Sequence, residues 1–166
     1  WSRYRLTVNS LKWKLRALNY NARFIELASE INTNMPRFAV SKVQDALNRH
    51  GKSVKNSRVL VLGVAYKRDI DDLRESPSLT IIEELQGRGA DVKYNDPYFA
   101  FVGKGRKYDL QMKNTPLENL GQYDCVLIVT DHSKVDWNLV ARHSRLVVDP
   151  RNACGRISGP REHIVN

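Results

Sequence analysis

The spacing of apolar residues along this chain changes near residue 58 from a helical pattern to an alternation of strands and helices. Residues 59–64, VLVLGV, form an apolar run that is typical of a buried strand in a parallel sheet, where helices cover both faces. Further strands are predicted over residues 91–95, 125–130 and 146–149, and helices over residues 77–88 and 136–143. The predicted fold class is therefore α/β, a Rossmann-like parallel sheet with right-handed crossovers, flanked by helices and preceded by an α-helical segment.

The residues before this alternation have helical periodicity and no strand of their own. Apolar stripes run along the helices predicted within residues 11–35. A break before Pro36 predicts the start of a new helix, whose apolar stripe consists of Val40, Val43 and Leu47. These apolar faces must be buried against the following domain, against each other or against a second copy of the chain.

The change of pattern divides the chain into a helical segment, residues 1–56, and an α/β domain, residues 57–166. The weakest pattern in the second part lies in residues 98–115, where we expect a loop with one short edge strand near Leu110. The following residues, 116–120, suit a short helix.

Composition limits the classes of protein that fit. The apolar fraction of 42% is that of a soluble globular protein, and neither a membrane span nor a signal peptide is evident, so we expect a cytoplasmic protein. The net charge of +9 comes entirely from residues 1–58, which hold 12 Lys and Arg against 3 acidic residues, because residues 59–166 hold 15 of each. This excess is spread over predicted helices without a nucleic-acid motif, which favours solvated helix faces over a nucleic-acid site.

Candidate chemistry follows the first strand. Tyr66, Lys67 and Arg68 lie at its predicted carboxyl end, where open α/β sheets bind ligands, and these two cations together with Arg74 indicate an anionic ligand. Four acidic residues and Arg74 come next, before Ser76, which is predicted to cap the following helix. A solvated cluster of salt bridges explains the same charges equally well.

Four stretches resemble one family in the same order along the chain. They are ARFIELASEINTNMP (residues 22–36), GVAYKRDIDDLRESPSL (63–79), VLIVTDH (126–132) and VVDPRNA (147–153). Together they resemble the UDP-glucose/GDP-mannose dehydrogenase family, in particular its UDP-N-acetyl-sugar 6-dehydrogenase branch. The resemblance covers the central helical segment and the C-terminal, UDP-binding domain of that family.

The resemblance implies roles for individual residues. Lys67 and Arg151 match family residues that contact the UDP part of the substrate, and Tyr66 matches an aromatic residue beside it. Arg74 matches a residue that lies toward the cofactor, which the other family domain holds. Since both predicted strands end at the same edge of a parallel sheet, Lys67 and Arg151 can meet at one site. For Tyr66, packing in the core is an equally good interpretation.

The resemblance also implies NAD as the family's cofactor and a nucleophilic Cys as its catalyst. A single glycine, Gly63, follows the first strand where the dinucleotide fingerprint needs three, so we expect no NAD binding by this chain alone. The family's Gly-rich Cys motif has no counterpart in WSRYRLTVNS, residues 1–10. Cys125 and Cys154 lie elsewhere, and their spacing suits neither a metal site nor a disulfide framework. His132 matches a family motif of unassigned role.

These observations predict the UDP-sugar-binding C-terminal domain of an NAD-dependent UDP-sugar 6-dehydrogenase, inactive as this isolated chain. The expected partners are UDP or a UDP-sugar and a second copy of the chain, because residues 11–50 resemble the family's α-helical dimerisation segment. The alternative is a stand-alone nucleotide-sugar-binding or dimerisation module without catalysis. A basic nucleic-acid-binding protein is a third, less favoured interpretation.

Overall fold

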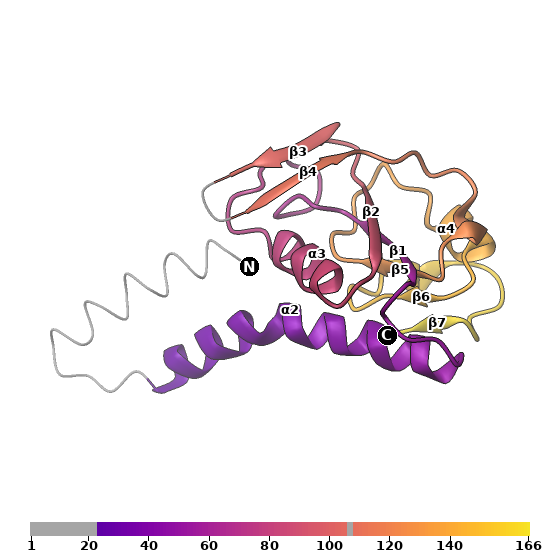
Figure 1. Ribbon diagram of the computed structural model, residues 1–166, viewed down its shortest axis with the longest axis horizontal. Helices are drawn as coiled ribbons and strands as arrows, with labels where there is room; N and C mark the ends of the chain where they lie inside the picture. Colours follow the sequence, from indigo (N-terminus) through magenta and orange to yellow (C-terminus); the bar gives the residue numbers. More distant parts are fainter. Residues whose placement is uncertain (1–22, 106–107) are drawn as a thin grey trace, which may run out of the picture.

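The computed structural model describes residues 23–105 and 108–166 (Figure 1). Its main sheet has five strands in the order β2-β1-β5-β6-β7, and every neighbouring pair is parallel. The strands are β1 (Arg58–Leu62), β2 (Asp91–Asn95), β5 (Cys125–Ile128), β6 (Val147–Val148) and β7 (Ile164–Val165). The predicted α/β class with a parallel sheet is confirmed, although β7 had no counterpart among the predicted strands.

Helices lie on both faces of this sheet (Figure 1). In the described residues they are α2 (Arg23–Arg49), α3 (Pro77–Gly87) and α4 (Trp137–His143), together with the short 3-10 helices η1 (Leu120–Gln122) and η2 (Ala153–Arg156). Alternate side chains of β1 point to opposite faces, so Val59 and Val61 pack with α2 and α3, whereas Leu60 and Leu62 pack with α4. The continuous apolar run of β1 is thus explained by burial on both faces.

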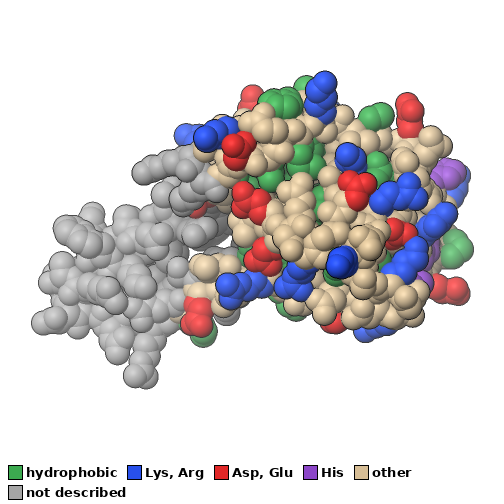
Figure 2. Space-filling view, in the orientation of Figure 1, with side chains coloured by type: hydrophobic (Ala, Val, Ile, Leu, Met, Phe, Trp, Pro, Cys, Tyr) green, Lys and Arg blue, Asp and Glu red, His purple; other side chains and the backbone are tan. Residues whose placement is uncertain are grey.

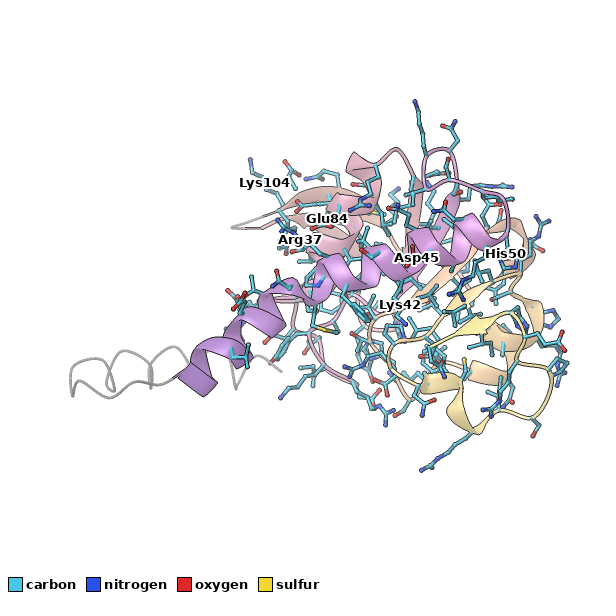
Figure 3. The ribbon with its side chains drawn as sticks, turned by 90° about the horizontal axis from the view of Figure 1, so that it is seen from below. Arg37, Lys42, Asp45, His50, Glu84 and Lys104 are labelled. Carbon is cyan, nitrogen blue, oxygen red and sulfur yellow. The ribbon has the colours of Figure 1, made fainter. Side chains whose placement is uncertain are left out.

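Helix α2 is a single helix, so the predicted break before Pro36 is wrong. Pro36 lies inside the helix, where its missing N–H removes one backbone hydrogen bond. The stripe of Val40, Val43 and Leu47 is completely buried against the α/β body, and this burial offsets the lost bond. Figure 3 shows α2 lying across the body, with Arg37 beside Glu84 of α3. The helix predicted around residues 11–18 lies outside the described residues.

Residues 98–115, where we predicted a loop with one short edge strand near Leu110, contain a β-hairpin. Strands β3 (Phe101–Lys104) and β4 (Asp109–Lys113) pair antiparallel in a separate two-stranded sheet. The strand near Leu110 is confirmed as β4, and β3 was not predicted. In β3 only Val102 is buried, so this four-residue strand has little apolar signal, whereas DLQMK of β4 alternates, with Leu110 and Met112 partly buried against the core. The short helix predicted over residues 116–120 is also wrong, since the helical turn is η1.

Two predicted helix starts are confirmed by their caps. The Ser76 hydroxyl accepts a hydrogen bond from the backbone N–H of Ser78, at the start of α3. Asp136 likewise accepts bonds from the N–H groups of Asn138 and Leu139 at the start of α4. These caps fix the residues at which the loops from the carboxyl edge of the sheet stop and the helices begin.

Charged side chains of both signs are interspersed over the described part of the face in Figure 2. This mixture differs from the one-signed patch that binds a nucleic-acid backbone. No helix within the described ranges is long and apolar enough to cross a bilayer.

Candidate functional site

A cavity of about 390 Å³ lies at the carboxyl edge of the main sheet. Tyr66, Lys67 and Arg68 reach it from the segment after β1, and Arg151 reaches it from the segment after β6. The Lys67 Nζ atom lies 5.5 Å from the centre of the Tyr66 ring, within reach of a cation–π contact. The structure therefore brings together four residues singled out in the sequence, Arg151 from one strand end and the run from Tyr66 to Arg68 from another.

Apart from Thr130, apolar side chains form the rest of the cavity wall. Pro36 and Ala39 come from α2, Ile81 comes from α3, and Val129 follows β5. The cavity therefore lies between the helical segment and the α/β body, and more than half of its lining residues are apolar ones that carry no chemical signature of their own. Sequence reasoning missed this contribution of α2.

A buried carboxylate holds the start of the segment that carries Tyr66 and Lys67. Asp96, which follows β2 and is fully buried, accepts hydrogen bonds from the backbone N–H groups of Val64 (2.7 Å) and Ala65 (2.9 Å). The Tyr66 N–H then donates to the Asp72 carbonyl at 2.7 Å, which closes the loop on itself. Lys67 and Arg68 are thus presented by a backbone that is fixed at its base.

His132 links the same carboxylate to the outer part of the loop. Its ring is completely buried, with Nε2 2.9 Å from an Asp96 carboxylate oxygen and Nδ1 accepting the Asp69 backbone N–H at 3.0 Å. Since Nδ1 accepts a hydrogen bond, Nε2 carries the proton of the neutral ring and donates a hydrogen bond to the Asp96 carboxylate. Burial alone would raise the pKa of Asp96, but the hydrogen bonds from His132 and from backbone N–H groups outweigh it and lower that pKa.

Arg151 is positioned by the turn after β6. The buried Asp149 carboxylate accepts hydrogen bonds from the backbone N–H groups of Arg151, Ala153 and Cys154. The Arg151 guanidinium then donates to Asp131 Oδ1 at 3.4 Å. Arg68 donates to the other oxygen of the same carboxylate and, through Nε, to the Asp131 carbonyl at 2.7 Å. Asp131 therefore joins the two arginines of the cavity.

Arg74 does not belong to the cavity wall. Its guanidinium donates to both carboxylate oxygens of Asp72, each at 3.0 Å, and its side chain is 89% exposed. These hydrogen bonds lower the pKa of Asp72. The pairing matches the salt-bridge interpretation of this loop for Arg74 and Asp72, whereas Lys67 and Arg68 point to the cavity.

Asp131 is the site residue that the sequence analysis did not single out. It directly follows Thr130 at the carboxyl end of β5, between the ends of β1 and β6 in the sheet order. The rule that placed Lys67 and Arg151 at one edge therefore also applies to Asp131.

The crossover from β1 to α3 does not fit a dinucleotide. Gly63 has φ +83°, and a Cβ atom built on it would lie 2.4 Å from the Thr130 carbonyl oxygen. The glycine is therefore needed here because the segment after β5 packs directly against its backbone. At the start of α3, the Ser76 and Ser78 hydroxyls donate to the carbonyls of Val64 and Gly63. These groups are engaged within the protein, and the glycine-rich backbone that would cradle a pyrophosphate is absent from this described crossover.

Both cysteines are buried in the described fold and unpaired as thiols. Cys125 belongs to the fully buried β5, and burial raises its pKa to about 12. Cys154, in η2, has its pKa raised to about 12 as well, by burial and the neighbouring Asp149. A thiolate nucleophile needs a lowered pKa, so neither side chain has the character of a reactive cysteine.

Comparison with known proteins identifies the family. Residues 60–156 match the model of the UDP-glucose/GDP-mannose dehydrogenase family, UDP binding domain. The matched residues include the three cations of the cavity, Lys67, Arg68 and Arg151, together with Asp131, which pairs with both arginines. The chain belongs to the UDP-glucose/GDP-mannose dehydrogenase family, as the resemblance of its motifs predicts.

Individual relatives place the chain within that family. It is 32% identical over 120 residues to the UDP-N-acetyl-D-mannosamine dehydrogenase of Methanococcus maripaludis, covering 72% of this chain and 26% of the relative. It is 29% identical over 147 residues to the UDP-glucose 6-dehydrogenase of Haloferax volcanii, covering 87% of this chain and 33% of the relative. The solved structure of the UDP-D-ManNAc dehydrogenase of Pyrococcus horikoshii is similar with a TM-score of 0.68 and 26% identity, over 88% of this chain and 33% of that one. The chain spans about a quarter to a third of the length of these relatives.

Proposed function

We propose that this chain binds the diphosphate of a UDP-sugar in the cavity at the carboxyl edge of its sheet. The observation that carries this proposal is the convergence of Lys67, Arg68 and Arg151, from two separate strand ends, on one cavity. A diphosphate spreads its charge over several oxygens, which a point-like ammonium and two forked guanidinium groups can share. The apolar wall from α2 and α3 suits the planar base, and the matched family model, which is named for UDP binding, supports uridine as that base.

Calorimetric titration of the purified chain with UDP tests this site. We expect Lys67→Ala and Arg151→Ala each to weaken UDP binding by about tenfold or more, since each removes a charge-assisted contact of roughly 1.5–3 kcal/mol. Arg142→Ala is the matched control, because Arg142 is an exposed cation in the last turn of α4 and should leave the affinity unchanged. Failure of the wild-type chain to bind millimolar UDP would refute the proposal.

We also propose that the chain, as the isolated 166 residues, does not oxidise the sugar. Neither buried cysteine contributes to the described cavity wall, and the crossover after β1 does not fit NAD. The NAD-dependent oxidation implied by the family would then need groups beyond those described here. Incubation of the chain with NAD and UDP-glucose, followed at the absorbance of NADH, should show no reduction. NADH formation that is lost in Lys67→Ala would contradict this part of the proposal.

The helical segment, residues 1–56, is proposed to carry the dimer contact through residues 11–50. Leu27 and Phe38 of α2 are 54% and 49% exposed, and the amino-terminal part of α2 projects beyond the α/β body (Figure 1). The carboxyl-terminal half of α2 packs on its own α/β domain, which leaves the amino-terminal half for a second copy. Sedimentation equilibrium should give a dimer that Leu27→Glu weakens, and a wild-type monomer at high concentration would contradict the proposal. A dimeric chain that binds no UDP would favour the alternative of a dimerisation module.

Two further expectations from the sequence remain part of the proposed function. They are a cytoplasmic location and a position of Arg74 near the cofactor of the family.

A further inference from the structure

In the part of the chain that the structure describes, Asp131 is the acidic residue that pairs with both arginines of the proposed site. Its side chain is only 14% exposed and lies between Arg68 and Arg151. Arg68 donates both to the Asp131 carboxylate and, through Nε, to its carbonyl at 2.7 Å, whereas Arg151 donates to the carboxylate alone at 3.4 Å. The carboxylate therefore accepts hydrogen bonds from both guanidinium groups at the edge of the sheet where an anion would bind, so these N–H donors are already engaged.

The charged side chains at this edge of the sheet can be compared with the charge of the ligand. Lys67, Arg68 and Arg151 supply three positive charges, and Asp131 removes one, so the edge offers two. A diphosphate that is esterified at both ends carries two negative charges. A diphosphate with a free terminal phosphate carries close to three at pH 8, because the second pKa of that phosphate is about 6.

We propose that Asp131 is a specificity-determining residue that makes the site prefer a diphosphate esterified at both ends, as in a nucleotide-sugar, over one with a free terminal phosphate. This inference rests on the proposed function and deepens it. Repulsion between the Asp131 carboxylate and the ligand grows with ligand charge, so it weakens the more highly charged ligand more. Specificity of this kind comes from a repulsive element placed beside the attractive ones.

The neighbouring carboxylates are engaged differently. Asp69 accepts hydrogen bonds from the backbone N–H and the hydroxyl of Ser133, and these bonds lower its pKa. Asp72 pairs with Arg74. Among the described residues neither acid pairs with Arg68 or Arg151, whereas Asp131 pairs with both, so the charge balance at the bound anion depends most on Asp131.

Calorimetric titration with two probes, UDP and UDP-glucose, tests the inference through the ratio of their dissociation constants. In Asp131→Asn, which keeps the side-chain shape and removes the charge, we expect this ratio to shift toward UDP by about three- to tenfold, as one screened charge a few ångströms away would produce. Asp131→Glu should restore the wild-type ratio. Asp71→Asn is the control, because Asp71 is an exposed acid of the loop after β1 with no ion pair to Arg68 or Arg151 in the described structure, and its ratio should stay as in the wild type.

The outcomes separate this inference from the proposal beneath it. A wild-type chain that binds neither probe overturns both. A wild-type chain that binds both probes, with a ratio that Asp131→Asn leaves unchanged, overturns the inference alone. An equal loss of both affinities in Asp131→Asn also overturns it, because the residue would then only hold the two arginines in place.

Discussion

Replacing His132 by alanine tests the view that one buried imidazole holds the base of the site together. The ring is completely buried and makes one hydrogen bond to the Asp96 carboxylate and one to the Asp69 backbone N–H. Loss of the bond to a charged group costs roughly 1.5–3 kcal/mol, and the orphaned N–H and the space left by the ring each add about 1 kcal/mol. We therefore expect His132→Ala to lower the free energy of unfolding by about 3–5 kcal/mol, a large part of the 5–15 kcal/mol typical of a domain.

Urea denaturation followed by tryptophan fluorescence measures this change, with the midpoint and the slope fitted together. His143→Ala is the matched control, since His143 is an exposed histidine at the end of α4 and its loss should cost less than about 1 kcal/mol. A cost for His132→Ala no greater than that of the control would refute the reasoning, because it would mean that water or a neighbouring group replaces both hydrogen bonds.

Three further outcomes follow from local geometry. Gly63→Ala should destabilise the chain by about 2–4 kcal/mol in the same assay, because its Cβ would meet Thr130 at positive φ, whereas Gly51→Ala, with open space around it, should cost only about 1 kcal/mol. The pKa of Asp96 is lowered in the folded chain, so the stability contributed by its ionised form is present above its unfolded pKa of about 3.9 and is lost as the pH falls through the folded value. The free energy of unfolding should therefore decrease on acidification below about pH 4, and it should decrease less steeply in Asp96→Asn. Burial raises the pKa of Cys125 to about 12, so a thiol reagent at pH 8 should label it slowly in the native chain and quickly in urea; equal rates would contradict its burial.

The sequence was a good guide wherever the determining physics is local. The run at residues 59–64 predicts a strand that is buried on both faces, and Ser76 and Asp136 predict two helix starts, because burial patterns and caps depend on residues close together in the chain. The rule for carboxyl ends of parallel strands then predicts that Lys67 and Arg151 share one edge of the sheet. The short strand near Leu110 was predicted and is present as β4, but β3 escaped prediction because only Val102 of its four residues is buried.

Only the tertiary structure decided which distant residues complete the site. Asp131 pairs with Arg68 across 63 positions of sequence and with Arg151 across 20, and no local period records either contact. The wall that α2 gives to the cavity likewise depends on the helix continuing through Pro36, because its apolar stripe gains more from burial against the body than one backbone hydrogen bond costs. Sequence by itself thus determined the family, the sheet and the strand ends, whereas the packing of segments far apart in the chain determined which charges oppose each other, since side-chain partners are chosen by proximity in space.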